Sequence, residues 1–164
     1  MNSITPMTTM LLLMSLSCSA QAGAPLKPDA INFEVPLVEA RQQLSAHCDS
    51  ISEQVIAPAQ IPGTKDRQLQ LNCEGFSFNG LPRKAEFVYR DGELMLVWIL
   101  TTAEEETGLE AWMRSSAEPS HTTNQFTAFT SQNMALRKVP HEVLFYSEAA
   151  APMFKAWFES AARE

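Results

Sequence analysis

Polar and apolar residues alternate along residues 67–74, which predicts a strand with one buried face. Its apolar positions are Leu69, Leu71 and Cys73. After Gly75 the apolar phase changes, because Phe76 and Phe78 occupy positions of the other parity. Side chains along a strand alternate with a period of two, so an unbroken strand does not permit this change. We therefore predict a β-bulge at Gly75.

Two turn signals follow, Asn79-Gly80 and Asp91-Gly92, and each predicts a two-residue hairpin turn between antiparallel strands. With the bulge included, the first turn pairs Phe78 with Leu81, Phe76 with Arg83 and Cys73 with Ala85. The second turn pairs Tyr89 with Leu94, Phe87 with Leu96 and Ala85 with Trp98. The two hairpins together form a three-stranded antiparallel unit.

The last of these strands, residues 94–100, is apolar on both faces. The predicted pairing places Met95, Val97 and Ile99 on its second face, beside Val88 of the neighbouring strand. One interpretation is a central strand with another layer packed over it. The alternative is an exposed apolar patch that contacts a partner, formed by these four residues.

Three segments show the spacing of amphipathic helices. The first begins at Pro36, and its apolar stripe consists of Leu37, Ala40, Leu44 and Cys48. The second follows a capping box at residues 102–105. The third begins at Pro152 and carries Phe154, Trp157, Phe158 and Ala161 on one stripe. Further short strands are predicted at residues 123–130, 134–139 and 142–147, and a loop at 57–66.

The order helix, three strands, helix, three strands, helix predicts an α+β fold. We expect an antiparallel β-sheet of about six strands with helices packed on one face. A single domain would cover residues 36–164, preceded by a flexible arm at residues 23–35. The element order loosely resembles that of small exported inhibitor and envelope-assembly modules, such as the β-lactamase inhibitor protein fold. The resemblance lies in element order only, so it implies no residue role and no activity.

The N-terminus has the features of a secretory signal peptide over residues 1–22. The apolar run at residues 10–16 is too short to span a bilayer, and Ala20-Gln21-Ala22 forms a cleavage site. We expect cleavage after Ala22, a periplasmic or secreted protein, and no transmembrane anchor in the mature chain. A lipoprotein anchored at Cys18 is an alternative, although Ser15 stands where such signals usually carry leucine. An uncleaved anchor is the other alternative.

Signal cleavage would leave two cysteines, Cys48 and Cys73, and an exported chain with two cysteines most simply forms one disulfide. Both fall on the apolar face of a predicted element, which supports the pairing. Loop-closure entropy gives such a bridge roughly 3–4 kcal/mol. The alternatives are a metal site formed with His47, and free or redox-active thiols. The chain lacks the Cys-x-x-Cys motif of thioredoxin-like oxidoreductases.

Charge and motifs exclude several classes of function. The formal net charge is −7, which makes nucleic acid an unsuitable partner. Neither Gly-x-Ser-x-Gly nor Ser-x-x-Lys occurs, and the six glycines form no phosphate-binding loop. The three histidines, His47, His121 and His141, have no partners at strong metal-ligand spacing. We therefore expect no metal, no cofactor and no enzymatic activity.

The sequence thus favours an exported, non-enzymatic protein that acts by contact with another envelope protein or with itself. The second apolar face, formed by Val88, Met95, Val97 and Ile99, is the candidate contact surface. The rival hypothesis is a small-ligand binder or hydrolase with a pocket between sheet and helices. His141, Glu142 and Tyr146 are its candidate polar residues. A cavity with two or more converging titratable groups would favour this rival, and a flat, well-packed surface would favour contact.

Overall fold

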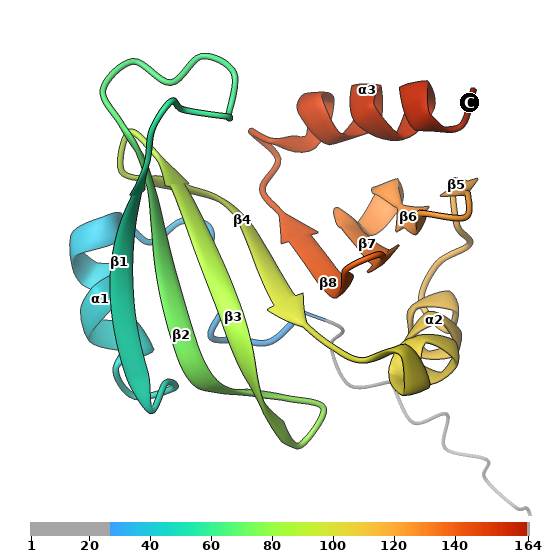
Figure 1. Cartoon of the computed structure of the whole chain (residues 1–164), viewed down its shortest axis with the longest axis horizontal. Coiled ribbons are helices and arrows are strands. Elements are labelled where there is room, and N and C mark those ends of the chain that lie inside the picture. The colour runs from blue at the N-terminus through green and yellow to red at the C-terminus, as the bar shows by residue number, and fades with distance from the viewer. Residues whose placement is uncertain (1–26, 164) are drawn as a thin grey trace, which may run out of the picture.

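The computed structural model describes residues 27–163, which form one eight-stranded antiparallel sheet with three α-helices (Figure 1). The first half comprises α1 (Leu37–Leu44), β1 (Ser50–Ile56), β2 (Gln68–Phe78), β3 (Leu81–Arg90) and β4 (Glu93–Leu100). The second half comprises α2 (Glu106–Arg114), β5 (His121–Thr122), β6 (Phe126–Phe129), β7 (Met134–Lys138), β8 (His141–Tyr146) and α3 (Ala151–Ala161). Short 3-10 turns at Ala103–Glu105 and Thr130–Gln132 precede α2 and β7. The predicted signal peptide and Cys18 lie outside the described residues.

The strand order β1-β2-β3-β4-β8-β7-β6-β5 gives each half a meander, and the two meanders meet at β4 and β8. The α+β class and the antiparallel sheet are confirmed, but the sheet has eight strands instead of about six. The sequence analysis missed β1 and the two-residue β5. No helix in residues 27–163 is long and apolar enough to cross a membrane.

Helices cover both faces of the sheet, so the expectation of helices on one face is wrong. Leu37, Ala40 and Leu44 of α1 and Leu109 and Met113 of α2 bury their side chains in one core cluster. Phe154 and Phe158 of α3 belong to a second cluster on the opposite face. The apolar residues of β4 are divided between these two clusters, which explains why this strand is apolar on both sides.

The predicted bulge at Gly75 is confirmed. Cys73 pairs with Ala85 and Phe76 pairs with Arg83, with the register shift between them. Gly75 has a φ of +78°, and a Cβ there would lie 2.1 Å from Oδ2 of Asp49. Glycine is favoured at this position, because any other residue would strain the left-handed backbone and would have to displace the Asp49 side chain.

The second hairpin contains a bulge that the sequence analysis did not predict. Tyr89 pairs with Leu94 as expected, but the register shifts before Val88, which pairs with Leu96. Phe87 therefore pairs with Val97 instead of Leu96, and Ala85 pairs with Ile99 instead of Trp98. The extra residue is Met95, and it moves every later side chain of β4 to the other face.

Two boundaries also differ from expectation. α1 ends at Leu44, so Cys48 lies in the loop that follows the helix and not on its apolar stripe. Ile31, in the segment predicted to be part of a flexible arm, is fully buried in the core with α1 and the sheet. The packed domain therefore begins before Pro36.

Candidate functional site

The second face of the sheet carries a groove of about 600 Å³. α3 covers this face only over the C-terminal strands, where Phe154 stacks on Tyr146 with ring centroids 4.7 Å apart and Phe158 contacts Phe126 at 4.8 Å. The loop at residues 57–66 covers the opposite side, through the buried Ile61. The groove lies between these two walls, and strands β2, β3 and β4 contribute most of its floor.

The wall formed by α3 is apolar. It presents Met153, Phe154 and Trp157 to the groove, and Met153 and Trp157 stay partly exposed. Trp157 packs against Phe126 at 5.3 Å, so the indole is held in place from behind. The partly exposed Trp98 extends the aromatic surface onto the floor.

The opposite wall is held by the side chain of Gln68, which is only 4% exposed. Its Oε1 accepts hydrogen bonds from the backbone N–H groups of Gln60 at 2.7 Å and Ile61 at 2.8 Å. A loop without regular structure is thereby fixed to β2 by a single amide. Satisfying buried backbone donors in this way keeps the wall ordered.

A carboxylate holds the far end of the same loop. Asp91, in the turn between β3 and β4, accepts hydrogen bonds from the backbone N–H groups of Lys65, Asp66 and Arg67 at 2.9, 2.8 and 3.0 Å. These bonds, led by that of Lys65, lower the pKa of Asp91 below its ordinary value of 3.8. The groove therefore has a rigid wall on the loop side as well as on the helix side.

Charged side chains converge at one end of the floor. Arg137 of β7 pairs across the strands with Glu142 of β8, and its Nη1 donates to Oε2 of Glu142 at 3.1 Å. The guanidinium also lies 5.4 Å from the ring centroid of Trp98, within cation–π range. Burial raises the pKa of Glu142, and the guanidinium of Arg137 opposes that rise. The second carboxylate of the groove, Glu86, pairs with Lys84 at 2.7 Å.

A row of side-chain amides begins in the groove at Gln70, which belongs to the lining, and continues beyond the lining on the same face of β1 and β2. Gln70 of β2 lies opposite Gln54 of β1, and Asn72 lies between Ser52 and Glu86 on the neighbouring strands. Nε2 of Gln70 donates to Oδ1 of Asn72 at 2.8 Å, which lines up the two amides along the strand. An amide side chain has two donor hydrogens and an acceptor oxygen, so both retain capacity for a ligand.

The four residues proposed as one apolar patch do not form a common surface. The bulge at Met95 places Val97 and Ile99 in the core with α1 and α2, where both are 0% exposed. Val88 and Met95 lie on the opposite face, in the cluster with α3, and are also buried. The prediction that these four residues form one patch is therefore wrong. Val88 does line the floor of the groove.

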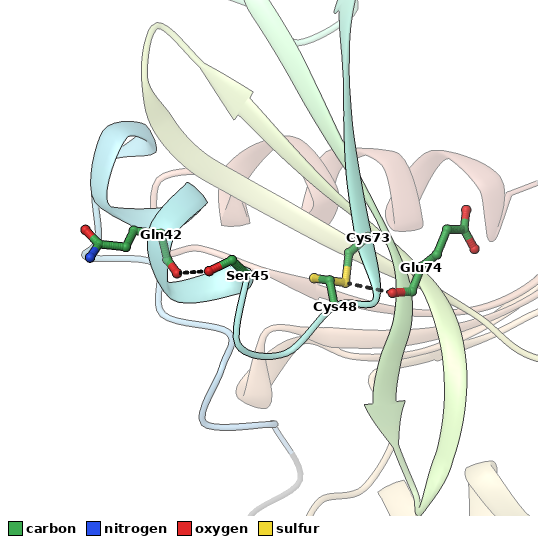
Figure 2. Close-up of a disulfide and its surroundings, with 5 residues drawn as sticks. All are labelled: Gln42, Ser45, Cys48, Cys73 and Glu74. Atoms are coloured by element: carbon green, nitrogen blue, oxygen red, sulfur yellow. Dashed lines mark hydrogen bonds between the residues drawn. A yellow bond between two sulfur atoms is a disulfide. The ribbon is translucent and has the colours of Figure 1, made fainter.

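The predicted cysteine pair is joined in the structure (Figure 2). Cys48, in the loop after α1, and Cys73, on β2, have Cα atoms 5.4 Å apart. Cys73 is fully buried, and Cys48 packs against the same core. The two sulfurs are bonded to each other, which replaces the alternative of a metal site with His47. Within residues 27–163, no group of three or more His, Cys, Asp and Glu side chains is arranged to hold a metal ion.

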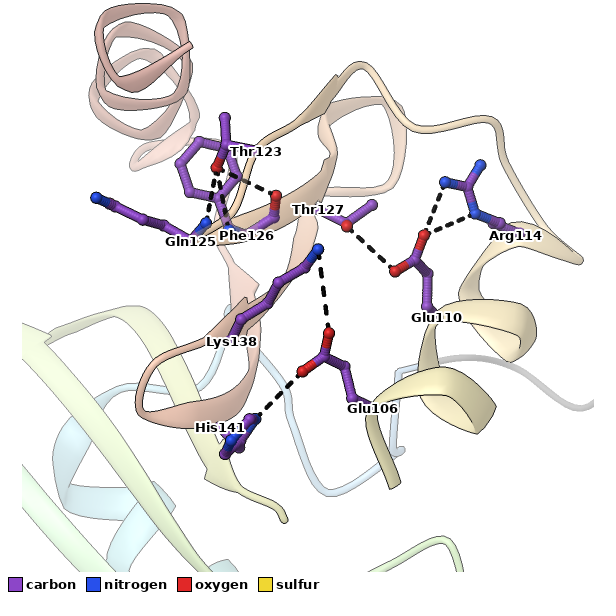
Figure 3. A network of polar contacts seen from close by, with 9 residues as sticks. All are labelled: Glu106, Glu110, Arg114, Thr123, Gln125, Phe126, Thr127, Lys138 and His141. Atoms are coloured by element: carbon purple, nitrogen blue, oxygen red, sulfur yellow. Dashed lines mark hydrogen bonds and ion pairs between the residues drawn. The ribbon is translucent and has the colours of Figure 1, made fainter. Parts of the chain in front are cut away.

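The candidate polar residues of the rival hypothesis do not form one site. Nδ1 of His141 lies 3.4 Å from Oε2 of Glu106 on α2, and Nζ of Lys138 lies 4.0 Å from the other oxygen of that carboxylate (Figure 3). Glu142 faces the groove on the opposite side of β8, and Tyr146 is buried beneath α3. Only Glu142 therefore belongs to the groove.

The rest of that polar network attaches α2 to the sheet. Glu110 accepts hydrogen bonds from Arg114 at 2.7 and 2.9 Å, and the fully buried hydroxyl of Thr127 donates to its other oxygen at 3.3 Å (Figure 3). Each carboxylate binds partners from β6, β7 or β8, or from α2 itself. The cluster therefore holds α2 against the sheet.

The sequence analysis missed Arg137, Glu86 and Trp98 as groove residues. The Arg137–Glu142 pair left a local signal, because a two-residue turn at Val139-Pro140 places these two side chains opposite each other. Trp98 and Glu86 left none, since their neighbours depend on the bulge at Met95. Comparison with protein-family models, curated proteins and solved structures finds no match for this chain.

Proposed function

We propose that this is an exported, non-enzymatic binding protein that holds its ligand in the groove between the 57–66 loop and α3. The observation that carries the proposal is the groove itself: a concavity of about 600 Å³ with apolar walls and a small set of convergent polar groups. Ligand sites in proteins have this combination of shape and chemistry. The fixed walls favour binding, because little order remains to be imposed when a ligand enters.

The side chains of the groove support binding over catalysis. Its lining, within the described chain, contains no serine, threonine, cysteine, histidine, lysine or tyrosine. The two carboxylates, Glu86 and Glu142, are each paired with a basic side chain. Each ion pair engages one oxygen of its carboxylate, and the described lining supplies no hydroxyl, thiol, imidazole or amine that a carboxylate could activate as a nucleophile.

Export is supported by the disulfide between Cys48 and Cys73, since such bonds persist in oxidising compartments. We place the protein in the periplasm or outside the cell, with its mature chain beginning at Gly23. Intact-mass measurement of the protein from the envelope fraction tests this placement. A mass that retains residues 1–22, or that carries lipid at Cys18, would contradict it.

The binding proposal is tested by hydrogen-exchange mass spectrometry of the purified mature protein, with and without an extract of the producing cells' envelope. We expect protection in peptides that cover the 57–66 loop, β3 and the first turns of α3. The α1 surface around Val38, which is 79% exposed, serves as the internal reference and should not change. Protection at α1 alone, or at no peptide, would contradict a ligand site in the groove.

A second candidate function, contact with an envelope protein or a second copy, is favoured by the edge strand β1. Its seven residues contain no proline and one charge, Glu53, which is paired with Arg41. Val55 at this edge is 57% exposed, and unprotected edges of this kind add strands from other chains. Light scattering tests the candidate: a dimer or complex that Val55→Lys dissociates supports it. A wild-type monomer that binds no envelope protein contradicts it.

A further inference from the structure

The charges of the groove are already neutralised by the protein. Arg137 binds Glu142 at 3.1 Å, and Lys84 binds Glu86 at 2.7 Å. A charged ligand would have to break one of these pairs or bring an unpaired charge beside a desolvated one, and both cost free energy. The groove therefore complements an uncharged ligand, although the whole chain carries a net charge of −7.

The amides at the β1–β2 end of the groove, Gln70 in the lining and its neighbours beyond it, both donate and accept hydrogen bonds. Gln54 and Gln70 face each other across β1 and β2, and Asn72 continues the row along β2. A hydroxyl group also donates and accepts, so one hydroxyl can pair with both ends of an amide. A row of amides thus matches a ligand that presents several neighbouring hydroxyls.

The aromatic side chains beside this row of amides supply apolar contacts for the same ligand. Trp98 on the floor and Trp157 on the α3 wall are both partly exposed and both line the groove. A sugar ring has a flat face of C–H bonds and an edge of hydroxyls. It can therefore pack its apolar face on an indole while its hydroxyls reach the amides.

A polypeptide segment suits the groove less well. An apolar helix face laid on this floor would remove water from the amides of Gln70 and Asn72 and satisfy none of the donors and acceptors that their mutual hydrogen bond leaves free, which costs free energy for each such group. An extended segment finds free backbone donors and acceptors at the edge of β1 and not within the groove. The amide row and the paired charges both favour hydroxyls over peptide groups.

We infer that the ligand of the groove is a neutral glycan that packs on Trp98 and Trp157, reaches the amide of Gln70 in the groove lining, and extends to the neighbouring amides of Gln54 and Asn72 on the same face of the sheet. This inference rests on the proposed function and specifies its ligand class. The groove has a volume of about 600 Å³, more than one sugar ring fills, so an oligosaccharide with several sugar units fits it better than a single sugar.

The test is isothermal titration of the purified mature protein with neutral oligosaccharides of glucose, mannose, galactose and N-acetylglucosamine. An acidic oligogalacturonate and an amphipathic leucine–glutamine helical peptide serve as competing probes. We expect at least one neutral oligosaccharide to bind with an affinity that is the same at low and high salt, because no net charge is exchanged. Gln70→Ala and Trp157→Ala should each weaken binding by about tenfold, whereas Val38→Ala on the far helix should not.

Three results would overturn the inference: no neutral oligosaccharide binds, the acidic probe binds at least as tightly, or the peptide binds instead. The two experiments together distinguish a wrong ligand class from a wrong binding site. If the envelope extract protects the groove from hydrogen exchange while the oligosaccharides do not bind, the groove is a site for another ligand class. If neither has an effect, both proposals are wrong.

Discussion

Gln68 offers a sharp test of what holds the groove open. Replacing it with methionine keeps the length of the side chain and its fit among buried neighbours but removes the acceptor oxygen. The backbone N–H of Ile61, in a buried environment, and that of Gln60, in a partly buried one, then lose their partner. A buried donor left without a partner costs about 1–3 kcal/mol, and a partly buried one less, so Gln68→Met should destabilise the protein by about 2–4 kcal/mol.

The matched control is Gln70→Met, two residues along the same strand and on the same face. Gln70 is partly exposed, and its amide hydrogen-bonds only to the side chain of Asn72, so its replacement should cost less than about 0.5 kcal/mol. Urea denaturation followed by tryptophan fluorescence measures both variants, with the m-value unchanged. Hydrogen exchange should also accelerate across the 57–66 loop in Gln68→Met alone. Equal stabilities for the two variants would refute the assignment of Gln68 as the side chain that fixes this wall.

Three further predictions concern the rest of the fold. Replacing Cys48 and Cys73 with alanine should lower the free energy of unfolding by about 3–4 kcal/mol in urea titrations, through loop entropy, and an unchanged value would contradict the bridge. Asp91 has a lowered pKa in the folded state, so its contribution to stability is present at neutral pH and is lost as the pH falls below about 4 through that lowered pKa. Asp91→Asn should therefore flatten the acid side of the stability profile, and an unaltered profile would contradict this. Val97→Lys should destabilise the monomer by about 3–5 kcal/mol because it buries an unpaired charge. Val38→Lys should leave circular dichroism melting unchanged, and a Val97→Lys variant that melts like the wild type would contradict the burial of Val97.

Local patterns predicted part of this fold well. The phase change at Gly75 was visible because residues 67–74 alternate strictly, so one inserted residue leaves a clear break. The bulge at Met95 could not be predicted because residues 94–100 are apolar at every position. Without alternation between polar and apolar residues, the sequence does not indicate which side chains face which side of the sheet. Without this bulge the predicted register was wrong by one residue beyond Met95. The prediction therefore placed Val97 and Ile99 on the opposite face of the sheet from the one they occupy.

Other features depend on contacts that no local pattern reports. β1 escaped notice because an edge strand is largely exposed, and its apolar residues do not alternate with polar ones. The placement of α3 on the second face follows from that face being apolar over β8 and β6, which requires the strand order to be known.

The groove also combines residues that a local pattern could predict with residues that depend on contacts between distant segments. Arg137 and Glu142 are neighbours through a short hairpin, so their pairing is a local property of the chain. Trp98, Glu86 and Gln70 reach the groove from three different strands, and its walls come from segments about 90 residues apart in sequence, at 57–66 and 151–157. The disulfide was predicted correctly even though Cys48 lies beyond its helix, because two cysteines in a chain that is expected to be exported leave few alternatives.

The three tryptophans provide the most direct measurement of the central claim. Trp98 and Trp157 line the groove, whereas Trp112 packs on Phe78 on the other side of the sheet, with ring centroids 5.8 Å apart. Each indole N–H gives its own signal in a ¹⁵N correlation spectrum of the folded protein. Adding the envelope extract, and then its neutral glycan fraction alone, should shift the signals of Trp98 and Trp157 and leave that of Trp112 in place. A spectrum in which only Trp112 moves, or in which none of the three moves, would contradict the groove as the site of function.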